Sequence, residues 1–185
     1  MNKEKKVAAA VPEGRGGAEK DRRSPLHVLF GAVLAALAVC ILVAGIMLPA
    51  MRVTGTGMAP TLTPGSIVLT LKGPHGEAGD LVAVQVNGRL VARRVIASGG
   101  ETVSIAEDGI VSVSGKRLDE PYLKGQAVQG LTGEYQVPEG QLFLMGDNRE
   151  EAVDSRHAAM GCVPEEMVSG RILLCIWPLN QLNFF

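Results

Sequence analysis

The sequence lacks an excess of charge of either sign. It carries 18 Lys and Arg residues against 19 Asp and Glu residues, and its formal net charge at pH 7 is −1. Proteins that bind nucleic acids usually present a strongly basic face, and no stretch of the body of this chain is strongly basic. We therefore expect no nucleic acid among its partners.

Cysteine, histidine and aromatic residues are also scarce. The chain has 3 Cys and 3 His residues, and aromatic residues make up 4% of it. No Cys pair has a C-x-x-C spacing or lies in a His-rich segment, as zinc sites usually do, so we predict no metal and no cofactor. Cys162 and Cys175 leave two interpretations open, a disulfide in an exported domain or two separate buried thiols.

Charged residues are absent from one long apolar run, residues 26–48. Spanning a bilayer takes about 20 apolar residues, whereas the apolar part of a cleaved signal peptide has only about 7–15. We interpret residues 25–49 as an uncleaved transmembrane signal-anchor helix in contact with membrane lipid. Residues 1–24 are polar with an excess of basic residues, so we expect a disordered tail. The positive-inside rule then places this tail in the cytoplasm and residues 50–185 outside the membrane.

Beyond the apolar run there is no long helical period, only short runs rich in β-branched residues. Asn87-Gly88 and Asp108-Gly109 separate such runs and are strong hairpin signals. We therefore predict a mainly β, antiparallel domain, with a smaller inserted part at residues 99–138 and a surface loop at residues 119–138. The predicted strands are residues 66–72, 80–87, 89–97, 102–106, 110–114, 141–146 and 169–177.

Three short motifs follow one another in this part of the chain. They are Gly57-Met58-Ala59-Pro60-Thr61-Leu62, then Arg93-Arg94-Val95, then Gly146-Asp147-Asn148-Arg149 continuing to Asp154-Ser155-Arg156. With the preceding apolar run, their order and spacing resemble the bacterial type I signal peptidase family over roughly residues 25–180.

The resemblance implies a fold and a mechanism. It implies an antiparallel β-sheet domain after one N-terminal membrane helix, in the bacterial cell membrane. Members work as serine peptidases without a histidine: a Ser hydroxyl attacks the peptide carbonyl and a neutral Lys accepts its proton. A second hydroxyl holds the Lys amine, and backbone N–H groups, in some members with a further hydroxyl, stabilise the oxyanion. The implied substrates are secreted preproteins, cleaved after a small-x-small motif.

The chain departs from this pattern at every chemical position. The nucleophile position is Gly57, which has no side chain, and the base position is Arg93, whose guanidinium is not deprotonated in proteins. The lysine-orienting position is Ala152, and Gly55 stands where some members have the additional oxyanion hydroxyl. If Gly57 had a positive φ, a serine in its place would cost about 1 kcal/mol.

Other side chains near the motifs are poor replacements for the missing groups. Thr56 is one residue out of register, and on a strand its hydroxyl would face away from the site. Ser155 lacks a base, and we interpret His75 and His157 as isolated, solvated loop residues. No Ser–His–Asp or Cys–His arrangement is visible.

We interpret the remaining motif residues as scaffold. The resemblance implies that Asp147, Asn148 and Arg149 tie a loop through hydrogen bonds, and that Asp154 and Arg156 form an ion pair beside the site. The predicted groove positions are Gly55, Met58, Pro60, Leu62 and Leu90, although simple core packing explains the last four of these as well.

Three hypotheses about function follow. The first is a non-catalytic protein that binds an extended peptide as an added β-strand. It would resemble the inactive signal-peptidase-like proteins that assist pilus or surface-protein assembly in some Gram-positive bacteria. The second is an active type I signal peptidase with a non-standard nucleophile. The third is a structural partner whose groove is unused.

Overall fold

The computed structural model describes residues 25–73, 76–86, 88–123 and 132–185. The tail predicted at residues 1–24 and the loop histidine His75 lie outside the described residues. The chain divides into one unit that ends at Cys40 and another that begins at Ile41.

Helix α1 (Pro25–Met47) forms the predicted apolar run. Its sequence contains no Asp, Glu, Lys or Arg, so the helix is apolar on all sides, as membrane-spanning helices are. A rise of 1.5 Å per residue gives it a length of about 34 Å, which is comparable with the roughly 30 Å hydrocarbon core of a bilayer. Leu26–Met47 is therefore long and apolar enough to cross a membrane.

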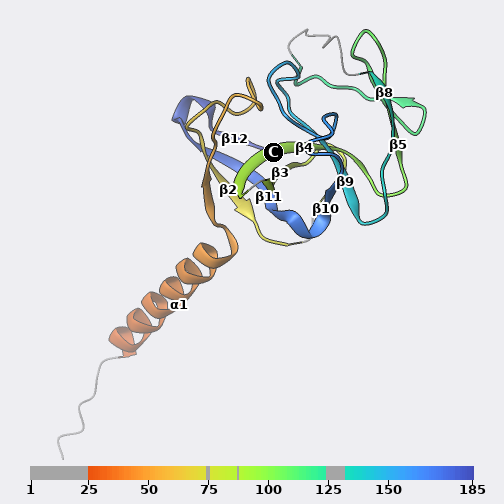
Figure 1. Cartoon of the computed structure of the whole chain (residues 1–185). Helices are drawn as coiled ribbons and strands as arrows, with labels where there is room; N and C mark the ends of the chain where they lie inside the picture. The colour runs from red at the N-terminus through yellow and green to blue at the C-terminus, as the bar shows by residue number, and fades with distance from the viewer. Residues whose placement is uncertain (1–24, 74–75, 87, 124–131) are drawn as a thin grey trace, which may run out of the picture. The chain divides into compact units, whose positions relative to one another are not determined.

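The described residues after this helix form two antiparallel sheets (Figure 1). The larger sheet has the strand order β1-β2-β11-β3-β4-β9-β10, with β12 paired to β11, and the smaller has the order β7-β6-β5-β8. The strands of the larger sheet are β1 (Ala50–Arg52), β2 (Ile67–Leu71), β3 (Leu81–Val86), β4 (Arg89–Ser98), β9 (Gln141–Met145), β10 (Val163–Pro164), β11 (Val168–Trp177) and β12 (Asn183–Phe184). Those of the smaller sheet are β5 (Thr102–Ile105), β6 (Val111–Val113), β7 (Lys116–Arg117) and β8 (Gly133–Gln136). Two short 3-10 turns, η1 (Glu165–Met167) and η2 (Leu179–Gln181), flank β11.

The predicted mainly β, antiparallel fold is confirmed. Every predicted strand is present with small shifts at its ends, and β3–β4 and β5–β6 pair as antiparallel neighbours, as the two hairpin signals indicate. One prediction is wrong, because residues 119–138 are not all loop: Gly133–Gln136 forms β8 and pairs with β5. The sequence also missed β1, β7, β10 and β12, which have only 2 or 3 residues and are too short to show an alternating pattern.

Strand β3 is buried on both of its faces. Leu81 and Ala83 belong to one hydrophobic cluster, whereas Val82 and Val84 belong to another, because successive side chains of a strand point to opposite faces. A strand covered on both sides does not alternate between apolar and polar residues. This explains why its sequence reads as one continuous apolar run.

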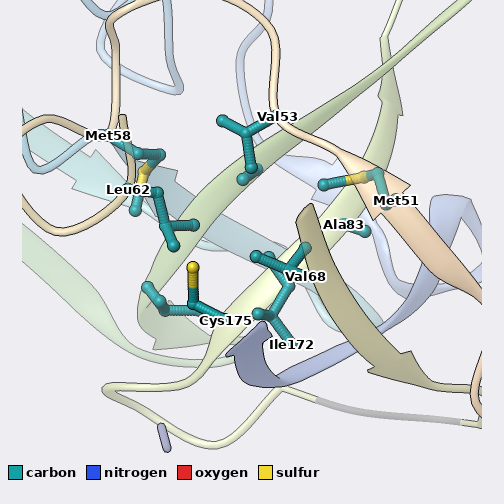
Figure 2. Close-up of a cluster of buried hydrophobic side chains, with 10 residues drawn as sticks. Met51, Val53, Met58, Leu62, Val68, Ala83, Ile172 and Cys175 are labelled. Carbon is teal, nitrogen blue, oxygen red and sulfur yellow. The ribbon is translucent and has the colours of Figure 1, made fainter. Parts of the chain in front are cut away.

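The segment between β1 and β2 is anchored in the first of these clusters. Met58 and Leu62 point into it together with Val53 and Cys175, as Figure 2 shows. Met58 is 2% exposed and Leu62 is 0% exposed, and full burial of such a side chain contributes about 1.5–3 kcal/mol. The backbone just before Met58 is therefore held against the larger sheet.

The two cysteines of the β domain are not paired with each other. Both thiols are free; Cys175 is buried and donates a hydrogen bond to the carbonyl of Trp177 at 3.2 Å. Cys162 packs against a separate cluster that β4, β5, β6 and β9 build, and burial raises the pKa of its thiol. The sequence left open a disulfide or two separate thiols, and in the structure the thiols are separate.

Candidate functional site

The first motif lies on a turn and not on a strand. Residues 55–62 follow the end of β1 as bends and turns, in which the Ala59 N–H donates to the Thr56 carbonyl and the Leu62 N–H to the Met58 carbonyl, both at 2.9 Å. The strand argument that turned Thr56 away from the site therefore does not apply. The Thr56 hydroxyl instead donates to the carboxylate of Glu151.

The three positions to which the family resemblance assigns the chemistry come together in space. A Cβ atom placed on Gly57 would lie 3.3 Å from Nη1 of Arg93 and 3.4 Å from both Cα and Cβ of Ala152. The positive-φ glycines include Gly55 but not Gly57, so the backbone objection to a serine at position 57 is wrong. Nucleophile, base and orienting positions are thus within contact distance of one another.

Gly146 makes this close approach possible. It follows β9, and a Cβ on it would lie 2.2 Å from Cβ of Ala152 and 2.4 Å from the carbonyl oxygen of Gly57. Real Cβ atoms do not approach other atoms so closely, because the van der Waals repulsion is too large. The Gly57 carbonyl also accepts the Asn148 N–H at 3.1 Å. The turn that carries Gly57 is therefore packed directly on the third motif.

Arg93 fills the base position with a cation that has only neutral partners. Its Nε and Nη2 donate to the Val153 carbonyl at 3.3 and 2.8 Å, and Nη1 donates to the carbonyl of Ala92 at 2.6 Å. Burial lowers the pKa of the Arg93 guanidinium, and the charge of Asp154 opposes that shift. A guanidinium nevertheless remains protonated in proteins, so it does not act as a general base.

Arg94, the next residue on β4, has a carboxylate partner. Its Nε and Nη2 donate to the two carboxylate oxygens of Asp147 at 2.8 and 2.6 Å, and the Thr61 hydroxyl donates to the same carboxylate at 2.5 Å. Such a bidentate pair is geometrically specific as well as strong. It ties the first, second and third motifs together, a role for Arg94 and Thr61 that sequence reasoning missed.

A second network extends from Arg94 to Arg149. The Tyr122 ring lies against the Arg94 guanidinium, 3.8 Å from ring centroid to Cζ, and its hydroxyl donates to Glu120 at 2.7 Å. Glu120 also pairs with Arg149, whose Nε donates to the Gly146 carbonyl at 3.1 Å. Burial, and then the hydrogen bond to Glu120, raise the pKa of Tyr122, so its hydroxyl is a neutral donor. Sequence reasoning placed Glu120 and Tyr122 in a surface loop and missed them.

The predicted ion pair of Asp154 and Arg156 is present and buried. Arg156 donates through Nε and Nη2 to the two carboxylate oxygens at 2.8 Å each, and the Gly146 N–H donates to Asp154 at 3.0 Å. The Ser155 hydroxyl accepts the Leu144 N–H at 2.9 Å. His157 is not isolated, because its Nδ1 accepts the Asp154 N–H at 3.3 Å. These contacts brace the end of β9 beside Ala152.

The predicted groove positions divide into buried and exposed ones. Met58 and Leu62 are core residues, as the packing interpretation has it, and present no side-chain surface to a ligand. Gly55 and Pro60 are exposed, and Leu90 is 37% exposed. Of the five predicted groove positions, only these last three present exposed surface.

Comparison with known proteins identifies the family. The family described as "Signal peptidase, peptidase S26" matches residues 26–177. The chain belongs to this family. It is 29% identical over 178 residues to a signal peptidase I of Bacillus licheniformis, covering 88% of this chain and 95% of that one. It is 30% identical over 167 residues to signal peptidase I T of Bacillus subtilis (strain 168), covering 82% and 86%. A solved signal peptidase I of Enterococcus faecalis V583 matches with a TM-score of 0.45 at 30% identity, over 52% of this chain and 96% of that one.

Proposed function

We propose that this member of the signal peptidase family is non-catalytic and binds extended peptide segments at the outer face of a bacterial membrane. One observation carries the proposal. Gly57, Arg93 and Ala152 are assembled at contact distance, yet they offer no nucleophile, no proton acceptor and no hydroxyl.

The absence of chemistry follows from the functional groups themselves. Acyl transfer by a serine peptidase requires a hydroxyl to attack and a base to accept its proton. Gly57 has neither, and the Arg93 guanidinium stays protonated. Removing a nucleophile or its base typically lowers the rate by about 10⁴–10⁶, and the losses are not additive. We therefore expect no processing of a preprotein above background.

Peptide binding does not depend on the missing groups. A peptide that adds to a sheet as a further strand is held by backbone hydrogen bonds, with small pockets for alternate side chains. The buried pairs Arg94–Asp147 and Arg156–Asp154 keep the surrounding backbone in place. The proposed partners are segments of secreted or surface proteins, such as pilins, by analogy with inactive members of the family.

Cleavage and crosslinking test the two halves of this proposal separately. Single-turnover assays in detergent, with a preprotein that carries an Ala-x-Ala site, should give no product. A photoreactive amino acid at the exposed position of Leu90 should capture an extended peptide, whereas the same probe at the exposed Lys116 on β7 should not. Cleavage would contradict the first half, and equal capture at both positions would leave the structural-partner hypothesis.

One contact favours a second candidate, an active peptidase with a non-standard nucleophile. The hydroxyl of Thr56 is hydrogen-bonded to the carboxylate of Glu151, and a carboxylate can serve as a general base. If the chain cleaves preproteins, Thr56→Ala and Glu151→Gln should each abolish the activity. Cleavage that survives both substitutions would exclude this pair.

The proposed topology is a single-pass anchor with its N-terminus in the cytoplasm. The uncharged helix α1 supports a membrane anchor, and the basic excess before it supports this orientation. Protease added outside spheroplasts should digest residues 50–185 and spare residues 1–24. Digestion of the tail with protection of the β domain would reverse the orientation.

A further inference from the structure

The Arg93 guanidinium forms no ion pair among the described residues, and it lies beside Gly57, the predicted nucleophile position. The ion pairs between charged side chains of the described residues involve Arg94, Arg149, Arg156 and Arg171, and none involves Arg93. Its side chain is partly buried, and the carboxylate whose charge acts on it, that of Asp154, is already paired with Arg156. Partly desolvated cations of this kind gain more from an anion than a fully solvated one does.

The hydrogen-bonding capacity of this guanidinium is not exhausted. A guanidinium has five N–H groups. One on Nε and one on Nη2 donate to Val153, and one on Nη1 donates to Ala92. One N–H on Nη1 and one on Nη2 are left without an acceptor among the described residues. Two N–H groups on neighbouring nitrogens are the arrangement that binds both oxygens of a carboxylate.

The geometry points to a binding site for the free carboxyl terminus of an extended peptide, with Arg93 as the residue that binds the carboxylate. This inference rests on the proposed peptide-binding function and specifies which peptides that site prefers. The ligand class is a chain end, such as the end that a peptidase leaves behind, and not an uninterrupted segment.

A terminal carboxylate fits this position better than an acidic side chain. Nη1 lies 3.3 Å from the point where a side chain on Gly57 would begin, so the guanidinium lies beside the position from which a nucleophile would reach the backbone carbonyl of a bound peptide. At a chain end that carbonyl carbon belongs to the carboxylate itself. An acidic side chain carries one or two additional methylene groups, and Ala152 lies within 3.4 Å of the same point. An amide at the same place leaves the cation without a counter-ion.

Peptide binding by the full chain in detergent tests this inference. Fluorescence anisotropy would compare four labelled peptides. Three share one sequence that includes Ala-x-Ala: the free acid, the C-terminal amide, and an extension by several uncharged residues. The fourth is the amide with Asp in place of the last Ala. The free acid should bind about tenfold more tightly than the amide and the extended peptide, because hydrogen bonds between charged groups are about twice as strong as neutral ones. Higher salt should reduce this preference.

Two variants assign the preference to Arg93. Arg93→Gln should bind the acid and the amide equally. Arg93→Lys keeps the positive charge but lacks the paired N–H donors of a guanidinium, so it should retain part of the preference for the acid. Arg89→Gln is the matched control, because Arg89 is exposed on the same strand; it should leave the preference unchanged. Circular dichroism checks that each variant is folded, and the salt dependence of the unmodified chain needs no variant.

The outcomes separate this inference from the function on which it rests. Equal affinity of the unmodified chain for acid, amide and extension would overturn the chain-end assignment and leave peptide binding intact. Equal affinity for the free acid and for the Asp amide would also overturn it, in favour of an acidic side chain. No binding of any of the four peptides would overturn both proposals.

Discussion

Arg93 and Arg94 are neighbours on β4, but the molecule surrounds them differently. Arg94 is 9% exposed and donates to both carboxylate oxygens of Asp147. Arg93 donates only to the neutral carbonyls of Ala92 and Val153. Adjacent side chains of a strand point to opposite faces. Arg94 therefore belongs to the buried ion pairs that hold the motifs together, which we call the frame of the site, whereas Arg93 lies beside Gly57.

The same contrast holds for the motifs as a whole. The family resemblance assigns the chemistry to the positions of Gly57, Arg93 and Ala152. The ion pairs around these positions, Arg94–Asp147 and Arg156–Asp154, are complete. A buried ion pair that loses one partner leaves an uncompensated charge. Single substitutions in these ion pairs should therefore lower the stability of the fold strongly. Gly57, Arg93 and Ala152 take part in no ion pair among the described residues.

The largest expected effect on stability comes from breaking the buried ion pair of Arg94 and Asp147. Asp147→Ala should lower the free energy of unfolding by about 3–5 kcal/mol, because the Arg94 guanidinium would remain buried without its counter-ion. Denaturant titration of the full chain in detergent, followed by circular dichroism, measures this. Asp80→Ala is the control: its pair with Arg171 is longer, at 3.4 Å, and more exposed, so the loss should stay below about 1 kcal/mol. Equal losses would mean that burial does not distinguish the two pairs.

Among the predicted groove positions, core and surface residues should differ in their effect on stability. Leu62→Ala should cost about 2–5 kcal/mol of unfolding free energy, since Leu62 is completely buried and its loss leaves a cavity. Leu90→Ala should change stability by less than about 0.5 kcal/mol and weaken peptide binding instead. The same titration and the anisotropy assay measure both quantities. A large stability loss at Leu90 would contradict its assignment to the surface.

Substitutions that put a nucleophile and a base back at positions 57 and 93 test whether the surrounding residues still hold these positions in a geometry that allows cleavage. Gly57→Ser alone should give no cleavage, because Arg93 cannot accept the proton and its Nη1 crowds the new Cβ. Gly57→Ser with Arg93→Lys should exceed either single variant by about 10²-fold, the lower end of what a general base contributes. Adding Ala152→Ser should raise the rate further, because a held amine spends more time aimed at the hydroxyl. The assay is single-turnover cleavage of an Ala-x-Ala preprotein.

The repaired variant also predicts a pH dependence. Burial lowers the pKa of the cation at position 93, so a lysine there should have a pKa below its usual value of about 10.4. Only the neutral amine accepts a proton, so cleavage should rise with pH and level off above that lowered pKa. A rate independent of pH would show that Arg93→Lys does not supply the base. A folded triple variant without activity would remove the main support for the peptide-binding proposal.

Removing the charge of Arg93 should also have only a small effect on stability. Arg93→Met should change the free energy of unfolding by no more than about 1 kcal/mol, because the charge it removes has no counter-ion and an apolar side chain of similar length relieves the cost of its burial. Denaturant titration beside Arg94→Met provides the comparison, and Arg94→Met should lose several times more. If Arg93→Met lost as much, the two arginines would share one structural role.

The fold and the family followed from local patterns. Residues 26–48 have no charge, and β-branched runs broken by Asn87-Gly88 and Asp108-Gly109 indicate paired strands, so the helix and the main strands were predictable. The substitutions at Gly57, Arg93 and Ala152 are equally visible, because the identity of a residue fixes its chemistry in any surroundings. Short strands such as Val163–Pro164 left no signal, since their pairing comes from the neighbouring β9.

Tertiary structure alone decided which of these residues meet. The amino-acid sequence determined that position 57 offers no hydroxyl and that position 93 carries a permanent charge. It did not determine that the Arg93 charge has no carboxylate partner, that Asp147 pairs with Arg94, or that Glu120 and Tyr122 join the frame from a predicted loop. Those facts depend on residues distant in the chain, and a hydrogen bond or an ion pair exists only where folding brings donor and acceptor within about 3 Å.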